Sequence, residues 1–312
     1  MKYKTAAAFR HALEDRLRQQ TLSGGAPLVR LRKMVAFDRF LARIAQKQPD
    51  AWIVKGGLAL QLRLGERART TKDIDVAAVN PWNREQTIEH LRAVVPVDLG
   101  DWFEFEVGEP AEAATGAPGR GFRFPIRCLL DGRPFETFHL DVGYGDPVLE
   151  APVELTAPCL LAFAEIAPAR VRCYPLTTQI AEKLHTYTRT YASGETSRSR
   201  DLADILLAAS LAQFDGAKLK QAIDATFKVR ASHPVPPQMP DPPQRIASSY
   251  AQVARELDLP WRTIEEAAAA AAQFLNPVLK GNSNVTKAKW NPLHWKWGSD
   301  GVDGASHCSS SE

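Results

Sequence analysis

Two aspartates separated by a single residue, Asp73 and Asp75, lie in a segment that otherwise has the composition of a buried β-strand. The segment reads RTTKDIDVAA, and its Ile74 and Val76 are β-branched. A strand directs residues two apart to one face, with Cα atoms about 6.6 Å apart, so both carboxylates point to the same side. Like charges in a partly covered site repel unless a cation lies between them. The pair therefore predicts a metal site.

A third aspartate, Asp141, lies in another segment with a strand pattern. The segment FETFHLDVGYGD at 135–146 alternates in polarity and ends in glycine-rich turn residues. Carboxylates combined with phosphate oxygens and water satisfy the ligation that Mg²⁺ prefers, so we expect Mg²⁺ or Mn²⁺. Such ions activate an attacking oxygen and neutralise a leaving pyrophosphate. The simpler alternative is that Asp141 caps a turn beside Gly143 and Gly145.

A glycine pair, Gly56 and Gly57, lies between a short apolar strand and a run with helical periodicity from Leu58 to Leu64. Without Cβ atoms the backbone can approach a ligand, and a helix N-terminus offers free N–H groups to a phosphate. For a glycine pair alone, a tight turn is the simpler interpretation. In combination with the aspartates, the pair favours a site for nucleotide phosphates.

The composition is that of a globular protein. The 312 residues are 45% hydrophobic and 24% charged, and the formal net charge of +3 permits a polyanionic partner without requiring one. We find no apolar run of eighteen residues and no signal-peptide core at the N-terminus, so we expect a cytoplasmic protein and no membrane partner. The four cysteines are scattered, which argues against a disulfide framework or a zinc site.

The pattern of polarity divides the chain into two lobes and a tail. Residues 1–157 are expected to be α+β, with strands that form a mixed sheet, and residues 158–282 are expected to be mostly helical. Residues 283–312 have no helical or strand period, and we expect them to be partly disordered. The expected elements of the first lobe are helices within 6–47 and at 84–95, and strands near 51–55, 73–79, 102–107, 121–130 and 135–146.

The string KGGLALQLRLGERARTTKDIDVAA resembles the glycine-pair and Asp-x-Asp signature of the DNA polymerase β-like nucleotidyltransferase superfamily. With TTQIAEKLHTYTRTY and SRSRDLADIL, it is similar to the AbiEii family of nucleotidyltransferase toxins, which includes the mycobacterial toxins called MenT. The resemblance runs from about residue 30 to about residue 282. It implies a polymerase β-like lobe, a helical C-terminal lobe and a nucleotide-binding cleft between them. One departure is the fifteen residues between Gly57 and Asp73, slightly more than usual.

The resemblance implies an activity as well as a fold. Toxins of this family use Mg²⁺ and a nucleoside triphosphate, and several transfer nucleotides to the 3′ end of tRNA, which blocks aminoacylation. An antitoxin encoded by an adjacent gene restrains them. We therefore expect a translation-blocking transferase with an RNA acceptor, foremost the tRNA 3′ end, and an antitoxin partner. The alternatives are transfer to a small hydroxyl compound or a protein, and a catalytically silent nucleotide-binding module.

Carried over residue by residue, the resemblance assigns five catalytic residues. Asp73, Asp75 and Asp141 would hold the metal, Lys183 in AEKLH would contact the triphosphate, and Asp201 in SRDLAD would take the family's C-terminal acidic position. From the residues alone, the simpler interpretation of Lys183 is a solvated residue on a helix face. That of Asp201 is a carboxylate favoured by the helix dipole.

Other residues are expected to contact the nucleotide or the RNA. Nucleotide contacts are assigned to Gly56, Gly57, Arg69, Thr71, Lys183 and Arg230. Basic residues around a cleft supply the sequence-independent part of RNA binding, and Arg230 is the strongest single candidate. The tryptophans of KAKWNPLHWKW are suited to stacking on bases, although attachment of the tail to the protein's own surface is the simpler interpretation. The sequence leaves open whether Asp201 or Asp204 faces the cleft.

Thr71 lies two residues before Asp73, where a phosphate would add about −1.5 to −2 charge beside the carboxylates. Related toxins are thought to be silenced by phosphorylation at a Ser or Thr in this position. The resemblance therefore implies regulatory phosphorylation of Thr71. The alternative is that Thr70 and Thr71 are β-favouring residues at the start of a strand.

Overall fold

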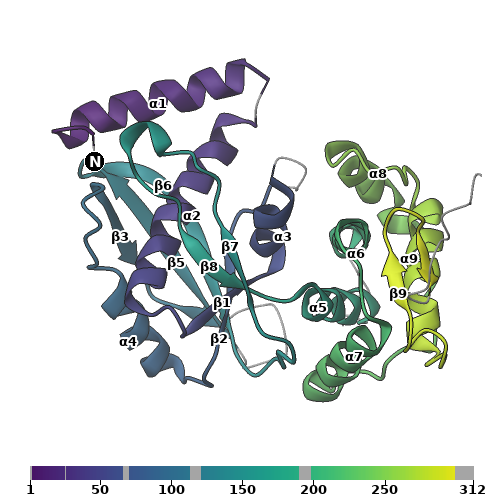
Figure 1. Ribbon diagram of the computed structural model, residues 1–312. Helices are drawn as coiled ribbons and strands as arrows, with labels where there is room; N and C mark the ends of the chain where they lie inside the picture. The colour runs from purple at the N-terminus through teal and green to yellow at the C-terminus, as the bar shows by residue number, and fades with distance from the viewer. Residues whose placement is uncertain (1, 25, 66–69, 113–120, 190–197, 299–312) are drawn as a thin grey trace, which may run out of the picture.

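A computed structural model of the chain describes residues 2–24, 26–65, 70–112, 121–189 and 198–298 (Figure 1). A lobe built on a β-sheet is formed by the first part of the chain, and a lobe of helices lies beside it. The predicted α+β class, with a mixed sheet and a helical C-terminal lobe, is confirmed.

The sheet of the first lobe has eight strands in the order β3-β5-β6-β2-β1-β8-β7, with β4 paired to β5. Strand β2 runs parallel to β6 and antiparallel to β1, which makes the sheet mixed. Its strands are β1 (Trp52–Lys55), β2 (Ile74–Ala78), β3 (Phe103–Val107), β4 (Ala111–Glu112), β5 (Gly121–Leu130), β6 (Arg133–Gly143), β7 (Val153–Thr156) and β8 (Arg170–Cys173).

The register of four neighbouring strands brings charged residues into one row. Asp75 on β2 lies opposite Lys55 on β1 and opposite Asp141 on β6. Asp141 in turn lies opposite Arg123 on β5. Because directly paired residues point to the same face of a sheet, the four side chains Lys55, Asp75, Asp141 and Arg123 share one face. With strands about 4.8 Å apart, this row spans about 14 Å.

Helices cover the opposite face of the sheet. They are α1 (Ala6–Leu22), α2 (Leu28–Lys47) and α4 (Arg84–Val94), and Figure 1 shows α2 crossing the strands with α1 above it. The apolar positions of α2 recur at helical spacing, and its Phe37 and Phe40 pack edge-on against Phe138 of β6. This packing leaves the face that carries the charged row available for chemistry.

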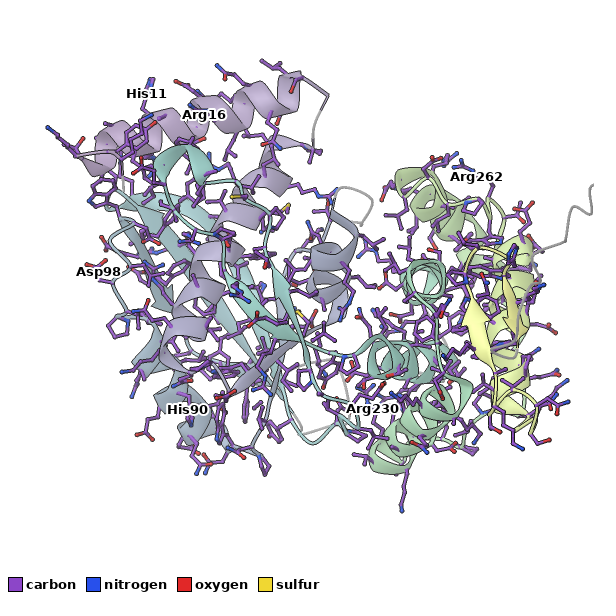
Figure 2. The ribbon with its side chains drawn as sticks, in the orientation of Figure 1. His11, Arg16, His90, Asp98, Arg230 and Arg262 are labelled. Carbon is purple, nitrogen blue, oxygen red and sulfur yellow. The ribbon has the colours of Figure 1, made fainter. Side chains whose placement is uncertain are left out.

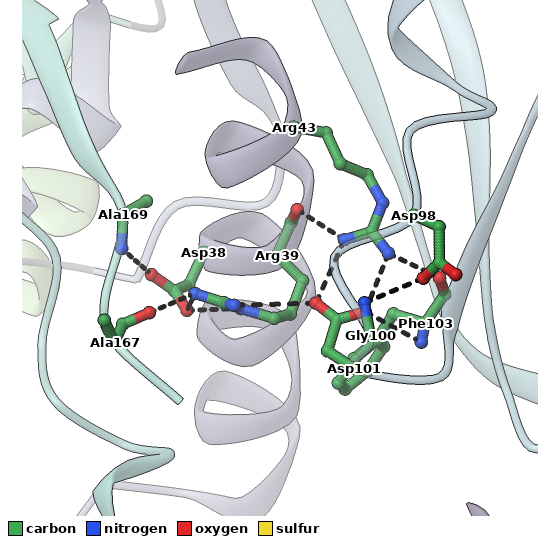
Figure 3. A network of polar contacts seen from close by, with 9 residues as sticks. All are labelled: Asp38, Arg39, Arg43, Asp98, Gly100, Asp101, Phe103, Ala167 and Ala169. Carbon is green, nitrogen blue, oxygen red and sulfur yellow. Dashed lines mark hydrogen bonds and ion pairs between the residues drawn. The ribbon is translucent and has the colours of Figure 1, made fainter. Parts of the chain in front are cut away.

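A buried polar network fixes α2 to the segments around it (Figure 3). The guanidinium of Arg43 contacts the Asp101 carboxylate at 2.7 Å and donates to the Phe103 carbonyl at 2.6 Å. Arg39 donates to the carbonyl of Ala167 at 2.7 Å. Both ions of the Arg43–Asp101 pair are only 1% exposed. Breaking one member of such a pair leaves an uncompensated buried charge, which is strongly destabilising.

We therefore expect Asp101→Asn to lower the free energy of unfolding by about 3 kcal/mol, because Arg43 keeps its charge without a counter-ion. Urea denaturation monitored by circular dichroism measures the change. Asp98→Asn is the matched control, since Asp98 is exposed and, among the described residues, accepts a hydrogen bond only from the nearby backbone N–H of Gly100. Equal losses in the two variants would contradict a stabilising role for the buried pair.

The second lobe has a hydrophobic core of its own. Its helices are α5 (Leu176–Thr188), α6 (Ser199–Leu211), α7 (Gly216–Arg230), α8 (Ala247–Glu256) and α9 (Ile264–Leu279). Short 3₁₀ turns lie at Ala162–Ala164, between β7 and β8, and at Gln244–Ile246, before α8. Helix α6 is buried along most of its length and packs against α5, α8 and α9. Helix α3 (Gly56–Leu64) of the first lobe contributes Leu60 and Leu64 to this core and so joins the lobes.

None of the described helices is long and apolar enough to cross a membrane.

The predicted limit of the first lobe differs from the observed sheet. Strand β8 pairs in parallel with β1 and antiparallel with β7, so the sheet continues to Cys173, past the predicted boundary between residues 157 and 158. Both β7 and β8 have only four residues, VELT and RVRC, and alternation over so short a stretch was not recognised as a strand in the sequence.

The first part of the tail forms two short strands that the sequence pattern did not predict. Strands β9 (Lys289–Asn291) and β10 (Lys296–Gly298) pair with each other, and Trp290 is fully buried with its Nε1 donating to the Ala209 carbonyl at 2.8 Å. Trp295 and Trp297 donate to carbonyls of α9. These tryptophans attach the tail to the helical lobe, as the simpler interpretation of the sequence held. Residues 299–312 lie outside the described residues.

Candidate active site

The aspartates lie together on the open face of β2 and β6. Asp75 and Asp141 are paired directly in the parallel register, and Asp73 lies just before β2. One carboxylate oxygen of Asp73 accepts the backbone N–H of His139 at 3.2 Å and lies 3.1 Å from His139 Nδ1. Asp73 is thereby attached to β6, the strand that carries Asp141. The structure thus brings the three predicted carboxylates to one place.

The surroundings of Asp75 oppose its ionisation. Burial, and next the negative charge of Asp141, raise the pKa of Asp75 from 3.8 to about 6, while Lys55 and Lys183 act in the opposite direction. Additional positive charge nearby favours the ionised form of such a carboxylate. The site is therefore short of cationic charge.

Arg123, which no motif in the sequence marks as a site residue, supplies part of that charge. Its Nε and Nη2 atoms contact the two carboxylate oxygens of Asp141, each at 2.7 Å, and Nη2 also lies 3.3 Å from Asp73. The hydrogen bond to Asp141 raises the pKa of the Arg123 guanidinium further. Within the described parts of the chain, no three His, Cys, Asp or Glu side chains form a metal-binding group. The Arg123 guanidinium bridges Asp141 and Asp73.

The donor set fits a hard divalent cation. Asp73, Asp75 and Asp141 offer only carboxylate oxygens, which Mg²⁺ and Mn²⁺ prefer. Burial, and after it the charge of Asp141, raises the pKa of Asp75, so a cation beside these two residues would favour the ionised carboxylate. These three residues would hold the cation, which would supply positive charge to the phosphates of a nucleotide.

Gly56 allows the backbone to pass close to Asp75. Its φ is +62°, and a Cβ at this position would lie 2.4 Å from the Asp75 Oδ2 atom. An L-residue is strained at this φ, and here it would also collide with the carboxylate. Gly57 follows as a buried residue in the first turn of α3. The predicted turn from strand to helix is thus present, with Gly56 beside the carboxylates.

Gly56→Ala is expected to displace the Asp75 carboxylate and to reduce nucleotidyl transfer at least about a hundredfold, besides losing about 1–2 kcal/mol of stability. Gly65→Ala is the control, because Gly65 also has a positive φ of +59° but nothing within 4 Å of its would-be Cβ. Thermal melting and a transfer assay separate the two effects. Similar activity in both variants would contradict the close approach at Gly56.

Lys183 lies on α5 between two acidic residues of α6. Its Nζ is 2.9 Å from Asp201 Oδ1 and 2.9 Å from Asp204 Oδ2. Both carboxylates are almost fully buried. The sequence left open whether Asp201 or Asp204 faces the cleft, and in the structure both contact Lys183. Because the charge of Lys183 acts on the pKa of Asp75, the ammonium lies toward the aspartates.

Arg230 joins the lobes through ion pairs. Its guanidinium binds Asp146 at 2.8 Å and Glu182 at 2.8 Å, and the side chain is only 6% exposed between the lobes (Figure 2). Lys55 contacts the same Glu182 at 2.9 Å and Asp146 at 3.1 Å. Arg230 was predicted to contact a phosphate, and in this structure its guanidinium is held by two carboxylates, as the ammonium of Lys183 is. The convergence of Asp146 and Glu182 on this residue gives no signal in the sequence.

The remaining predicted nucleotide contacts lie in the segment before β2. The Thr71 hydroxyl donates to the Asp73 carbonyl at 3.1 Å, and Thr71 is 7% exposed. Arg69 lies outside the described residues. Thr71 therefore supports the backbone that carries Asp73, and its hydroxyl is largely covered.

A mixed sheet with a glycine turn and three aspartates on its open face, joined to a helical lobe, has the architecture of the polymerase β-like nucleotidyltransferases. The family described as "Nucleotidyl transferase AbiEii toxin, Type IV TA system" matches residues 39–280. The chain belongs to this family of nucleotidyltransferase toxins from type IV toxin–antitoxin systems.

Comparison with solved structures gives a similar fold. MenT4, a nucleotidyltransferase toxin from Mycobacterium tuberculosis H37Rv, is 22% identical over 69% of this chain and 70% of its own, with a TM-score of 0.51. ANT(2″)-Ia in complex with adenylyl-2″-tobramycin is 21% identical over 62% of this chain and 97% of its own, with a TM-score of 0.36. No curated protein sequence matches the chain.

Proposed function

We propose that the protein transfers a nucleoside monophosphate from a nucleoside triphosphate to a hydroxyl at the 3′ end of an RNA, foremost a tRNA. The acceptor oxygen forms a bond to the α-phosphorus, the bond to pyrophosphate breaks, and the hydroxyl proton is released. The observation that carries this proposal is the pairing of Asp75 with Asp141 beside Gly56 and Lys183. Membership of a toxin nucleotidyltransferase family supports the same reaction.

The described residues take separate roles in this proposal. Asp73, Asp75 and Asp141 hold Mg²⁺, which supplies charge to the phosphates when it is bound. Lys183, held by Asp201 and Asp204, presents a point charge to the triphosphate from the helical lobe. Gly56 lets the backbone of the strand-to-helix turn approach the nucleotide.

The proposed reaction blocks translation, because a tRNA with an extra 3′ nucleotide cannot be aminoacylated. Membership of a type IV toxin family implies a cognate antitoxin. Transfer to a small hydroxyl compound or to a protein remains the competing proposal for the same site, and a silent nucleotide-binding module is the third. The three carboxylates argue against the last, because nucleotide binding alone does not require them.

Incubation with each labelled nucleoside triphosphate, Mg²⁺ and total RNA from a bacterial host tests the acceptor. We expect label in a small RNA band and its removal by digestion from the 3′ end. Parallel reactions with cell protein and with aminoglycosides test the competing acceptors. Label in either of these and none in RNA would overturn the RNA proposal while leaving nucleotidyl transfer intact.

Phosphorylation of Thr71 is proposed as the control of this site. A phosphate there would break the hydrogen bond to the Asp73 carbonyl and add negative charge beside Asp73. Because Thr71 is 7% exposed, its modification requires the segment to open. Thr71→Glu is expected to lose most activity, whereas Thr71→Val keeps much of it. An active Thr71→Glu variant, or no added mass on Thr71 after co-expression with the antitoxin, would contradict the switch.

A further inference from the structure

A groove of about 840 Å³ begins at Asp73 and follows the open face of β5 and β6. Three register pairs run along it from the active site outward: Arg123 with Asp141, Pro125 with His139, and Arg127 with Thr137. The five residues from Arg123 to Arg127 span about 13 Å along the strand. The segment from Thr70 to Asp73 and the first turns of α2 also line the groove.

Basic residues outnumber acidic residues among the described residues that line the groove, and two of them form ion pairs within the sheet lobe: Arg123 with Asp141 and Asp73, and Lys33 with Glu136. The lining residues include the basic residues Lys33, Lys72, Arg123 and Arg127, and the acidic residues Asp73 and Glu106. Lys72 is exposed and adjacent to Asp73 in sequence. Arg127 and Glu106 form a surface pair that is about half exposed on both sides, and water or phosphate replaces such a pair at little cost.

Apolar groups lie between these charges. Pro125 is exposed on the floor of the groove, Val107 is partly buried beside it, and Val29 is 67% exposed at the rim. Alternating cations and apolar surface is the combination that binds single-stranded nucleic acid, in which phosphates contact the charges and bases rest on the apolar groups.

The groove and the nucleotide site lie on opposite sides of the carboxylates. Along the row across the sheet, Lys55 lies at the end that contacts Glu182 of the helical lobe, and Arg123 lies at the end that opens into the groove. Asp75 lies opposite Lys55 in the register of β1 and β2, whereas Asp73 lines the groove. In phosphoryl transfer the attacking and leaving oxygens are roughly in line, so the two substrates must approach from opposite sides.

We propose that this groove binds the single-stranded 3′ end of the acceptor RNA, with its terminal hydroxyl at Asp73 and its phosphates along Lys72, Arg123 and Arg127. This inference rests on the proposed function, and it names the surface that the RNA uses. The triphosphate binds on the opposite side, between Gly56 and Lys183.

Charge reversal tests the groove. Lys72→Glu and Arg127→Glu are each expected to weaken binding of an RNA hairpin with a short single-stranded 3′ overhang about three- to tenfold. Each is also expected to reduce the slope of log affinity against log salt by about 0.7. Lys47→Glu is the control, because Lys47 is exposed on α2 about 21 Å along the helix axis from Lys33. Equal losses in all three variants, or none in the groove variants, would overturn the proposal.

A crosslink locates the RNA directly. The same hairpin, with thiouridine next to its 3′ end, is irradiated with the full-length protein, and the crosslinked peptides are identified by mass spectrometry. We expect peptides from β5 and from the segment containing Lys72. If the hairpin is labelled by nucleotide transfer but crosslinks to the helical lobe, the groove is wrong and the proposed function stands. If the hairpin is neither labelled nor bound, the RNA acceptor fails, and the groove proposal fails with it.

Discussion

Asp75→Asn is expected to lower nucleotidyl transfer at least about a thousandfold, because it removes a charged ligand of the cation that stabilises the phosphates. Asparagine keeps the shape of the side chain and fits against Gly56, where a larger group would not. A transfer assay at saturating Mg²⁺ and nucleotide measures the loss. Retention of more than a few per cent of activity would contradict a cation site that depends on Asp75.

The same substitution is expected to leave the protein as stable as the parent at pH 7, or more stable. The folded protein raises the pKa of Asp75 from 3.8 to about 6, so it binds the proton more tightly than the unfolded chain does. Ionisation of Asp75 therefore costs stability as the pH rises from about 4 to 6, by at most about 3 kcal/mol at pH 7. The asparagine of the variant does not ionise, so we expect the stability difference between variant and parent to disappear below about pH 4.

Thermal melting without Mg²⁺, at a series of pH values, tests this dependence. A strongly lowered melting temperature for Asp75→Asn at pH 7 would mean that the substitution disrupts the fold, and its loss of activity would then say nothing about the metal. Added Mg²⁺ should raise the melting temperature of the parent and not that of the variant, because a ligand that binds only the folded state stabilises it.

Lys183→Ala is expected to have two large effects. Without the ammonium, Asp201 and Asp204 keep their buried charges with less compensation, which should cost about 3 kcal/mol of stability. The triphosphate should also bind at least about tenfold more weakly, while RNA binding changes much less. Urea denaturation, isothermal titration with a non-hydrolysable nucleotide, and RNA anisotropy measure the three quantities.

A second variant separates these two effects. Lys183→Ala with Asp204→Asn should recover much of the lost stability, because one buried charge is removed, yet it should still bind the triphosphate weakly. Lys220→Ala is the matched control, since Lys220 forms an i,i+4 pair with Asp224 on the surface of α7 and contributes little. If the double variant regains both stability and nucleotide affinity, Lys183 contributes to the stability of the fold and does not contact phosphate.

Periodicity predicted most of the elements, because in long helices and alternating strands the buried residues are apolar and recur at regular spacing in the sequence. Helices α1 and α2 are separated at residues 23–27 as expected, and β5 and β6 cover the predicted segments. Asp73, Asp75 and Asp141 could be grouped from the sequence because each lies in or beside a segment with the apolar pattern of a strand. Their pairing across β2 and β6 needed the register, which no local pattern gives.

Residues that depend on long-range pairing were not predictable. Arg123 reads as an ordinary exposed arginine in the alternating segment GFRFPIR, and only the register of β5 against β6 places it on Asp141. The ion pairs of Arg230 with Asp146 and Glu182 likewise join residues that lie far apart in the sequence. Trp290 lies in a segment without helical or strand period, and its burial follows from the space between α6 and α9.

The position of a bound cation tests the assignment of the active site most directly. Crystals grown with Mn²⁺ and a non-hydrolysable nucleoside triphosphate give an anomalous signal at the metal. We predict a peak coordinated by the carboxylates of Asp73, Asp75 and Asp141, with Arg123 displaced from at least one of Asp73 and Asp141, and with the triphosphate extending toward Lys183. A peak elsewhere, or a nucleotide bound with Arg123 still bridging Asp141 and Asp73 and no metal at the aspartates, would contradict it.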